Sequence, residues 1–322
     1  MSQTLVSFII PHKGRENFLI ETLKSIVLQD FDHSQIQVVL ITQNRELSDA
    51  VKQYENQINL HIYHLDDSLT ISHLRNYGVK QTDSPYLAFL DADVYLSSNW
   101  CQCMMETLES DSSRVLVSAA QIAGDNPTPL EAIRVVLSNA AIDAEVDFLP
   151  GRNLFISREM FEKVGGFPEH LITCEDYYFT DKVHELGSLY YTSQASYIHL
   201  GEDKVYSEMY KKEIWRGQSN LQSIQGRKIP LREIPSFIVP LAIPALALLA
   251  ALLMLLQLPV VAVLFAILAG IPLLAYATRV YFLAQKEIGF RYILLFYLYY
   301  FPARAIGTIG GLFNNLKSNS HN

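Results

Sequence analysis

Two aspartates stand one residue apart at the end of an apolar run, an arrangement suited to binding a metal ion. Residues 86–95 read YLAFLDADVY, so Asp91 and Asp93 follow a stretch with the pattern of a buried strand. In extended backbone the side chains of residues i and i+2 project to the same side, so both carboxylates can reach one site. Such oxygen ligands suit Mg²⁺ or Mn²⁺, which also bridge phosphate groups. By itself, the pair fits a solvated loop with two capping carboxylates better than a metal site.

Short β-rich runs alternate with helical patterns over the first part of the chain. Strands are predicted at residues 5–10, 37–42, 60–65, 85–90 and 115–120, and helices at 16–29, 70–81 and 98–109. The alternation indicates βαβ units and an α/β fold with a mostly parallel sheet, covered by helices on both faces. Ligands bind beyond the carboxyl ends of the strands in such sheets. Asp91 and Asp93 follow one of these ends, and Pro11, His12 and Lys13 follow another.

Residues 121–230 are less regular, but they contain a second pair of carboxylates. Glu175 and Asp176 lie near the start of a predicted helix over residues 174–187, whose expected C-cap is Gly187. The other elements predicted here are a short helix between the glycines of 151–167, a strand over 188–200 and a helix around Trp215.

The charge is distributed unevenly along the chain. The net charge is −8, with −12 on residues 1–230 and +4 on residues 231–322. The acidic first part argues against nucleic acid as a main partner, because phosphate backbones are bound by basic surfaces. A small phosphorylated ligand held through a metal ion remains compatible with it. The cysteines Cys101, Cys103 and Cys174 are too few for a disulfide framework, so we expect reduced thiols in a cytoplasmic domain.

Residues 234–278 form a run of 45 residues without a charged side chain. Two membrane-spanning helices fit this run, over about residues 234–256 and 259–281, with a turn at 257–259. The alternative is a buried hairpin of a soluble protein, but both helices are apolar on all sides. Basic residues flank the hairpin at Arg227, Lys228, Arg232, Arg279, Lys286 and Arg291. The positive-inside rule therefore places both ends in the cytoplasm, in a multi-pass protein of the plasma or inner membrane.

A third apolar stretch, over about residues 290–316, is interrupted by Pro302 and Arg304. An arginine at the centre of a bilayer is costly, and the aromatic run FYLYYF suits the headgroup region. We expect a helix in the membrane interface, or a re-entrant one, with a third span as the alternative. The sequence thus predicts a cytosolic domain over residues 1–230 and a membrane region over residues 231–322.

Several motifs in a fixed order give the sequence a specific resemblance. They are SFIIPHKGR (7–15), LRNYGV (74–79), FLDADV (89–94), GRNLFISREMFEKVGGF (151–167), the pair Glu175-Asp176, Gly187 and His199. This set resembles the family 2 glycosyltransferases, which are inverting enzymes of the GT-A class. The resemblance implies a Rossmann-like nucleotide-diphospho-sugar transferase domain, followed here by membrane helices.

The resemblance also implies roles for individual residues. The expected contacts with a nucleotide-diphosphate sugar are Pro11, His12, Lys13, Arg15, Arg75, Asp91, Gly151 and Asn153. Arg75 would approach the nucleotide, where a cation offsets phosphate charge. Asp93 would bind Mn²⁺ or Mg²⁺, with Asp91 at the ribose or the metal's water shell and His199 as a third contact. The alternatives are a surface arginine on a helix and a structural histidine on a strand.

Glu175 and Asp176 resemble the E-D pair of this family. An inverting transfer needs one base that takes the proton of the acceptor hydroxyl as it attacks the anomeric carbon. We expect Asp176 to be this base, with Glu175 as the second choice. The positive end of the helix dipole favours both carboxylates as well, which gives them a purely structural alternative.

The sequence departs from the family at three points. ITQNRE (41–46) follows the second strand in place of the usual acidic segment, so Gln43, Asn44 or Asp66 must hold the base. The choice between a UDP- and a GDP-sugar therefore stays open. Lys182 replaces an arginine that often follows the E-D pair, which keeps the charge without the bidentate fork. The Q-x-x-R-W motif of processive synthases is absent, so we expect transfer of a single sugar.

These observations predict a membrane-anchored, metal-dependent glycosyltransferase of the hexosyltransferase type. It would move one sugar to a lipid-linked or other membrane-proximal glycan acceptor, in the synthesis of cell-surface polysaccharide or glycolipid. The alternative from another class is a non-catalytic membrane scaffold that has kept the fold, against which both carboxylate pairs argue.

Overall fold

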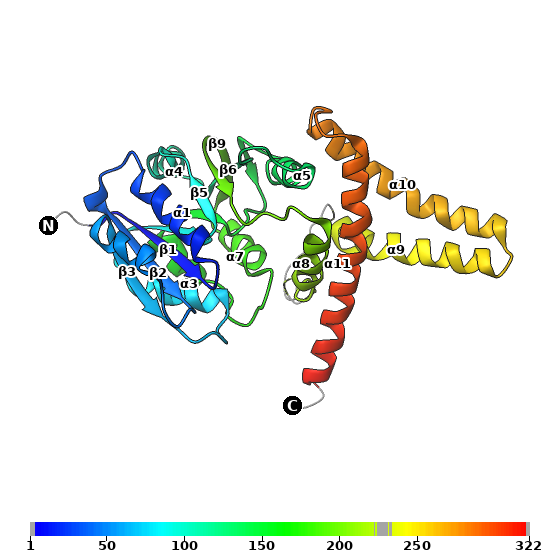
Figure 1. The fold of residues 1–322 in the computed structure, drawn as a ribbon, viewed down its shortest axis with the longest axis horizontal. Helices are drawn as coiled ribbons and strands as arrows, with labels where there is room; N and C mark the ends of the chain where they lie inside the picture. Colours follow the sequence, from blue (N-terminus) through cyan, green and yellow to red (C-terminus); the bar gives the residue numbers. More distant parts are fainter. Residues whose placement is uncertain (1–3, 222, 224–230, 232–233, 320–322) are drawn as a thin grey trace. The chain divides into compact units, whose positions relative to one another are not determined.

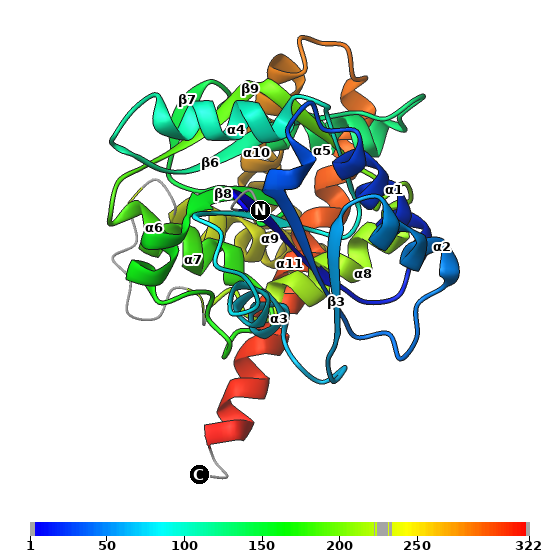
Figure 2. The same cartoon turned by 90° about the vertical axis from the view of Figure 1, so that its left-hand side faces the viewer.

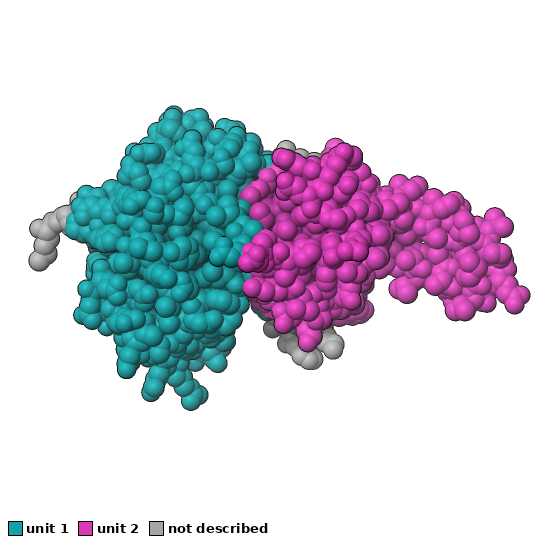
Figure 3. All heavy atoms as spheres, turned by 45° about the horizontal axis from the view of Figure 1, so that its top comes forward, with its two compact units in different colours: residues 1–125, 141–202 teal, residues 126–140, 203–322 magenta. Residues whose placement is uncertain are grey.

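The structure, a computed structural model, describes residues 4–221, 223, 231 and 234–319, with only the backbone described for 314–319. The chain forms two compact units, which are coloured separately in Figure 3. Unit 1 comprises residues 1–125 and 141–202, and unit 2 comprises residues 126–140 and 203–322. Unit 2 therefore begins before residue 230 and includes a segment from the middle of the sequence. The flanking basic residues Arg227, Lys228 and Arg232 lie outside the described residues.

Figure 1 shows the elements in chain order. The strands are β1 (Val6–His12), β2 (Ile36–Thr42), β3 (Asn59–His64), β4 (Tyr86–Leu90), β5 (Val94–Leu96), β6 (Arg114–Ile122), β7 (Ala144–Val146), β8 (Asn153–Ser157) and β9 (Ser188–His199). The helices are α1 (Glu16–Val27), α2 (Asp49–Lys52), α3 (Ile71–Val79), α4 (Trp100–Glu109), α5 (Pro129–Ser138), α6 (Arg158–Val164), α7 (Glu175–His184), α8 (Tyr206–Gly217), α9 (Ile234–Leu255), α10 (Pro259–Leu283) and α11 (Phe290–Asn319). Short 3₁₀ helices cover His33–Gln35 and Gln53–Asn56.

The strands that the structure describes in unit 1 form one sheet in the order β3-β2-β1-β4-β8-β6-β9-β5, with β7 paired to β9. The strands β3, β2, β1 and β4 run parallel, as the alternation of strands and helices predicts. β6 and β9 also pair in parallel, but the prediction of a mostly parallel sheet is wrong for the other pairings. There β8 runs antiparallel to β4 and β6, and β5 and β7 run antiparallel to β9. β8 comes from the 151–167 motif, where a strand of five residues is too short to be distinguished from a helix by periodicity.

The direction of β8 decides which residues meet at one end of the sheet. Because β8 runs antiparallel to β4, its first residues lie beside the last residues of β4, and Asn153 pairs with Leu90. The Asp91 N–H donates to the Arg152 carbonyl over 3.0 Å. In the same way, β5 runs antiparallel to β9 and pairs its first residue with His199. The two reversals bring three distant segments of the chain to the carboxyl end of β4.

Helices cover both faces of this sheet, as the sequence predicts. Alternation along β1 sends Phe8 and Ile10 to the face that packs against α1 and α4. Ile9 points to the other face, where it joins buried residues of α3, α6 and α7. Figure 2 shows α4 above the strands β6 and β8, and α6 and α7 below them.

Two local predictions are wrong. β1 does not end at residue 10, as predicted, but continues along β2 to His12, after its pairing with β4 has ended at Ile9. A proline fits there because β1 then has a partner strand on one side only. Gly187 is not the C-cap of α7, which ends three residues earlier. It provides space instead, because a Cβ at this position would collide with the Ser113 carbonyl oxygen.

Unit 2 contains three helices that are long and apolar enough to cross a membrane, by length and composition. They are α9, α10 and the part of α11 from Phe290 to Phe313. α9 and α10 lie side by side as the predicted hairpin, and Gln257 between them adopts a left-handed conformation with φ 58° (Figure 1). Only 17% of the apolar window is buried in α9 and in α10, against 44% in α11. α11 therefore differs from the hairpin in how much of it contacts protein.

A buried carboxylate of α8 contacts the arginine that interrupts the third apolar stretch. Arg304 Nε lies 3.3 Å from Glu213 Oε2, and Glu213 also contacts Arg134 and Arg216. Burial acts to raise the pKa of Glu213, but the three arginine charges outweigh it and hold that pKa at about 2. This cluster fixes α11 to α8 and α5 within unit 2.

Gly78→Ala should destabilise unit 1, because α3 packs directly on the sheet at this glycine. A Cβ at Gly78 would lie 2.6 Å from side-chain carbons of Ile9 and Ile41. Overpacking of this kind costs about 1–3 kcal/mol. The loss should appear in chemical unfolding of the full chain in detergent, followed by Trp100 fluorescence in a Trp215→Phe background.

The matched control is Gly270→Ala, a helical glycine of α10 with no atom within 4 Å of the added Cβ. This variant should keep the wild-type unfolding midpoint. An unchanged midpoint for Gly78→Ala would contradict the packing of α3 described above.

Candidate active site

Asp93 and His199 meet at the carboxyl end of β4. The Asp93 Oδ1 and His199 Nε2 atoms are 3.4 Å apart, and His199 Nδ1 lies 3.0 Å from Glu202 Oε2. Burial and the charge of Arg152 act to lower the pKa of His199, but the two carboxylates raise it above its ordinary value. Burial acts to raise the pKa of Asp93, but His199 and the nearby arginines hold it below its ordinary value. Asp93 is therefore a buried carboxylate surrounded by cations.

Arg75 of α3 joins the two carboxylate pairs. Its side chain is 1% exposed, with Nη2 2.9 Å from Asp91 Oδ1 and Nη1 3.1 Å from Glu175 Oε1. Nη2 also donates to the Gly151 carbonyl over 3.1 Å, and the guanidinium lies over the Phe167 ring. Its terminal nitrogens are thus bound to protein groups, which gives Arg75 a positioning role. Its expected contact with a nucleotide stays a prediction.

Glu175 and Asp176 form the first turn of α7, as predicted. Asp176 Oδ2 accepts the Gly151 N–H over 3.1 Å, and Oδ1 accepts the Tyr177 N–H over 2.8 Å. Burial and the charge of Asp176 raise the pKa of Glu175 to about 7, against the lowering effect of Arg75. The pair thus combines a carboxylate fixed by two N–H groups with a carboxyl group that titrates near neutral pH.

His12, at the end of β1, is buried at the same edge of the sheet. Its Nδ1 lies 2.9 Å from the Thr42 hydroxyl, and its Nε2 has no hydrogen-bond partner among the described residues. Burial lowers the pKa of this histidine, which favours the neutral ring. Pro11 beside it is buried within the strand. The unfilled Nε2 is a place where a ligand can hydrogen-bond.

The loops after β1, β2 and β3 meet beside His12. Lys13 Nζ donates to the Asp67 carbonyl over 2.9 Å. Gln43 Nε2 donates to the Asp66 carbonyl over 2.7 Å, and the Asp66 carboxylate accepts the Ser68 hydroxyl and N–H. Gln43 and Asp66, two of the three residues expected to hold the base, therefore lie together, and their contact with a base stays a prediction.

Gly151 lies in the site, whereas Asn153 faces the core. A Cβ at Gly151 would lie 3.1 Å from the Asp176 Cβ and 3.2 Å from Arg75 Nη2. Asn153 is fully buried, and its Oδ1 accepts the Trp100 indole N–H over 3.1 Å and a backbone N–H of β6 over 2.9 Å. Gly151 keeps the two carboxylate pairs close, and Asn153 anchors β8. The donor contacts expected of both stay predictions.

Arg152 and Glu202 also belong to this site, although neither is among the residues predicted from the sequence. Arg152 Nη1 lies 3.6 Å from Glu202 Oε2 and donates to Gln121 Oε1 over 2.8 Å. The charge of Arg152 also acts on both aspartates after β4. Arg152 stands inside the GRN motif, between two residues that were selected, and Glu202 follows His199 by three positions. The place of Arg152 in this motif and the spacing of Glu202 from His199 are the features of the sequence that point to them.

Asp93 after β4 and His199 of β9 are the residues that would hold a divalent metal ion. The 3.4 Å between the Asp93 carboxylate and His199 Nε2 is compatible with two ligands of one ion, and oxygen with imidazole suits Mn²⁺. Glu202 holds the other ring nitrogen of His199, as outer carboxylates of metal-binding histidines do. Among the described residues, no group of three or more His, Cys, Asp and Glu forms a ready-made metal site. Asp91 faces a buried arginine, and Asp93 Oδ2 contacts Arg15.

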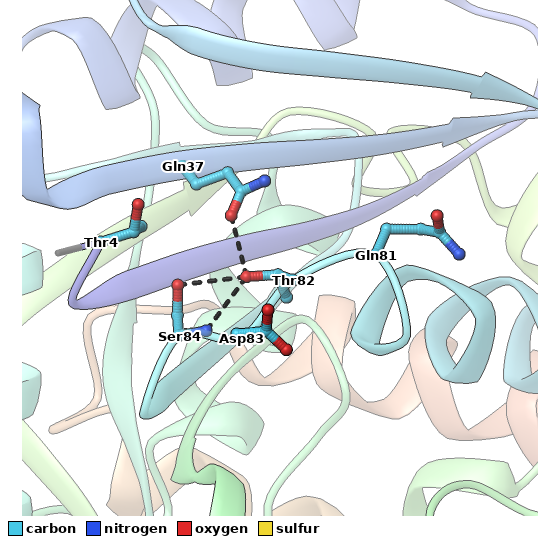
Figure 4. Close-up of a pocket in the computed structure, with 6 residues that line it drawn as sticks. All are labelled: Thr4, Gln37, Gln81, Thr82, Asp83 and Ser84. Carbon is cyan, nitrogen blue, oxygen red and sulfur yellow. Dashed lines mark hydrogen bonds between the residues drawn. The ribbon is translucent and has the colours of Figure 1, made fainter. Parts of the chain in front are cut away.

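The pocket drawn in Figure 4 lies at the opposite edge of the sheet. Its lining residues are Thr4, Gln37, Gln81, Thr82, Asp83 and Ser84, at the amino ends of β1, β2 and β4. The Thr82 hydroxyl bonds to the Gln37 amide oxygen and to the Ser84 hydroxyl there. Neither carboxylate pair lines this pocket, so it is separate from the candidate active site.

Comparison of the sequence with known families and proteins gives consistent matches. The family model of Glycosyl transferase family 2 matches residues 7–165. Glycosyltransferase AglE of Haloferax volcanii is 24% identical over 245 residues, which cover 73% of this chain and 79% of AglE. Poly(ribitol-phosphate) beta-N-acetylglucosaminyltransferase TarS of Staphylococcus aureus is 24% identical over 215 residues, which cover 64% of this chain but 36% of TarS.

Solved structures share the fold. Mannosyltransferase PcManGT from Pyrobaculum calidifontis, in complex with GDP-Man and Mn²⁺, aligns with a TM-score of 0.62 at 18% identity, over 96% of this chain and 88% of that one. S. aureus TarS 1–349 in complex with UDP aligns with a TM-score of 0.50 at 17% identity, over 93% and 90%. These likenesses show a mixed α/β fold of the GT-A type.

The raised pKa of Glu175 should make the free energy of unfolding depend on pH. With a pKa of about 7 in the folded chain against 4.5 for the free side chain, the folded state binds more protons between these values. The stabilisation of the folded state by the proton on Glu175 is therefore complete below about pH 4.5. It is lost as the pH rises to 7, by up to ~3 kcal/mol. Glu175→Gln should flatten this part of the curve, measured by chemical unfolding from pH 5 to 8.

The exposed Glu55→Gln serves as the control and should keep the wild-type slope. If the Glu175→Gln and wild-type slopes coincide, the proton is not held at Glu175.

Proposed function

Because the chain belongs to family 2 of the glycosyltransferases through its domain at residues 7–165, we propose a specific activity for it. It is a membrane-anchored inverting enzyme that moves a single sugar from a nucleotide-diphosphate sugar to a lipid-linked or membrane-proximal glycan acceptor. One observation carries this proposal, namely the convergence of both carboxylate pairs at one edge of the sheet. Arg75 contacts Asp91 of one pair and Glu175 of the other.

The proposed base is Asp176. The acceptor hydroxyl oxygen forms a bond to the anomeric carbon, while the bond from that carbon to the diphosphate oxygen breaks. The hydroxyl proton passes to the Asp176 carboxylate, and the nucleoside diphosphate leaves with the electron pair. The Gly151 and Tyr177 N–H groups fix both Asp176 oxygens, so the base is held in place before the acceptor arrives. Glu175, with a pKa of about 7, is the second candidate.

A UDP- or GDP-sugar is the proposed donor. The solved relatives with this fold contain GDP-Man or UDP. In this chain, the buried His12 Nε2 has hydrogen-bonding capacity that no described residue fills, and buried polar atoms are ordinarily paired. Lys13 and Arg15 follow it and supply positive charge for a diphosphate. Gln43 and Asp66 are proposed to hold the base.

The proposed metal is Mn²⁺ or Mg²⁺, held by Asp93 and His199 with Asp91 nearby. When bound, it supplies positive charge that stabilises the leaving diphosphate. Glu202 orients the His199 ring for this role, and Arg75 fixes Asp91.

The long apolar helices of unit 2 support the proposal that the acceptor lies at the membrane. We assign α9 and α10 as two spans with their turn outside the cell, which leaves unit 1 in the cytoplasm. α11 lies in the interface in this assignment, because its Arg304 contacts Glu213 of the charged helix α8, which does not suit the bilayer core. An enzyme so anchored acts on lipid-linked substrates, which suits the synthesis of cell-surface polysaccharide or glycolipid.

Asp93→Ala and Asp176→Asn should each lower kcat by roughly 100-fold or more, since one removes the metal contact and the other the base. The measurement is release of nucleoside diphosphate with Mn²⁺, a panel of UDP- and GDP-sugars and a lipid-phosphate acceptor. Asp83→Asn, an exposed aspartate at the opposite edge of the sheet, should keep wild-type turnover. Unchanged turnover in either site variant would refute the role given to that residue.

The two-span assignment predicts which cysteine substitutions react with a membrane-impermeant maleimide in intact cells. Leu258→Cys, between α9 and α10, should be labelled from outside, whereas Glu287→Cys before α11 and Phe313→Cys within it should be labelled only after lysis. The wild-type chain, with its three native cysteines, gives the background. Labelling of Phe313→Cys from outside would mean that α11 is a third span.

A further inference from the structure

Arg15 contacts the oxygen of Asp93 that does not face His199. Its Nη2 lies 2.9 Å from Asp93 Oδ2, while Asp93 Oδ1 faces His199 at 3.4 Å. Both oxygens of this carboxylate therefore have a cationic or polar partner in the structure. A metal ion that bound Asp93 through Oδ2 would have to displace the arginine.

The contact is built into the fold by Gly201. A Cβ at Gly201 would collide with Asp93 Oδ2 and lie 2.9 Å from Arg15 Nη1. Only a residue without a side chain leaves this space, so the backbone after β9 accommodates the Arg15–Asp93 pair.

The two partners differ in how firmly they are held. The Arg15 side chain is 56% exposed, whereas those of Asp93 and His199 are 12% and 9% exposed. Because the Arg15 side chain lies largely in water, solvent screens its ion pair with the buried Asp93, so Arg15 can leave at small cost while Asp93 and His199 stay in place. Of Arg15, Asp93 and His199, Arg15 is thus the residue whose side chain can move.

We propose that Arg15 is a placeholder for the metal ion, which makes metal and diphosphate bind as a pair. This inference rests on the proposed function, because it takes the ligands to be a divalent cation and a nucleoside diphosphate. Without the diphosphate, Arg15 neutralises Asp93 and repels an incoming dication. With it, the phosphate oxygens bind the guanidinium, which suits them in charge and geometry, and release Asp93 to the metal.

The charges around the site support this coupling. Asp91 is balanced by the buried Arg75, and Glu202 lies near Arg152. With Arg15 on Asp93, the carboxylates of Asp91, Asp93 and Glu202 each lie beside an arginine, and Arg75 is shared between Asp91 and Glu175. A dication is then favoured only when a ligand brings negative charge with it.

The test measures Mn²⁺ binding rather than turnover. The full chain in detergent is titrated with Mn²⁺, and free Mn²⁺ is followed by its electron paramagnetic resonance signal, alone and with saturating UDP or GDP. Arg15→Ala should bind Mn²⁺ alone about tenfold more tightly than the wild type, since removing a charge near a carboxylate changes cation affinity on this scale. The gain in Mn²⁺ affinity caused by the diphosphate should shrink in the same variant. Arg15→Lys keeps the charge and should stay near the wild type.

Two controls identify the site. Lys24→Ala also removes one positive charge, from the exposed face of α1, where Lys24 lies 3.4 Å from Glu21, and should leave both Mn²⁺ affinities unchanged. Asp93→Asn should abolish the tight binding in the wild-type and Arg15→Ala backgrounds. Binding that survives Asp93→Asn is binding elsewhere, and overturns the proposal.

The nucleotide-free titration separates this inference from the proposed function. If Arg15→Ala binds Mn²⁺ alone no more tightly than the wild type, the placeholder role is wrong, whatever the diphosphate does. If Arg15→Ala tightens Mn²⁺ binding but UDP and GDP leave the wild-type affinity unchanged, the coupling and the proposed donor class fail together. Both expected changes, seen in one variant, support the inference.

Discussion

The buried guanidinium of Arg75 is the contact on which the site depends. A buried charge is tolerated only with paired, hydrogen-bonded partners, and those of Arg75 come from the end of β4 and the start of α7, 16 and 100 positions away. Satisfying one cation therefore forces α3, β4 and α7 together. Because Asp176 follows Glu175, the same requirement places the proposed base beside the aspartates. A lysine could not do this, since it lacks the planar fork that reaches both carboxylates.

In unit 2 a buried charge also joins distant segments, but its sign is reversed. There a buried carboxylate, Glu213, gathers arginines from α5, α8 and α11, and holds an apolar helix against a charged one. Unit 1 is organised by a cation among carboxylates, and unit 2 by a carboxylate among cations. In both cases, the ion pairs join segments that are far apart in sequence, whereas the apolar residues supply most of the buried surface.

How well the sequence predicts a feature depends on how far apart along the chain the residues that determine it lie. The parallel strands and their helices show the regular spacing of apolar residues within a few positions, and the apolar hairpin is a long run without charge. Both could therefore be predicted from the sequence. The strands β5, β7 and β8 have three to five residues and carry no clear period. Their antiparallel pairing depends on partners elsewhere in the chain. For the same reason the motifs identified Arg75 and Arg15, but not what either contacts. Arg152 and Glu202 were missed because only the folded sheet places them beside Asp93.

The antiparallel pairing of β5 with β9 has a consequence for how the protein is made. β5 can pair only after β9 has been synthesised, about a hundred positions later in the chain. β9 also pairs with β6 and β7. Contacts of such long sequence separation form late, because the loop between them must first be closed. Unit 1 therefore completes its sheet only when β9 has left the ribosome, and α9 follows soon after. Synthesis thus places the last step of folding just before the first of the long apolar helices emerges.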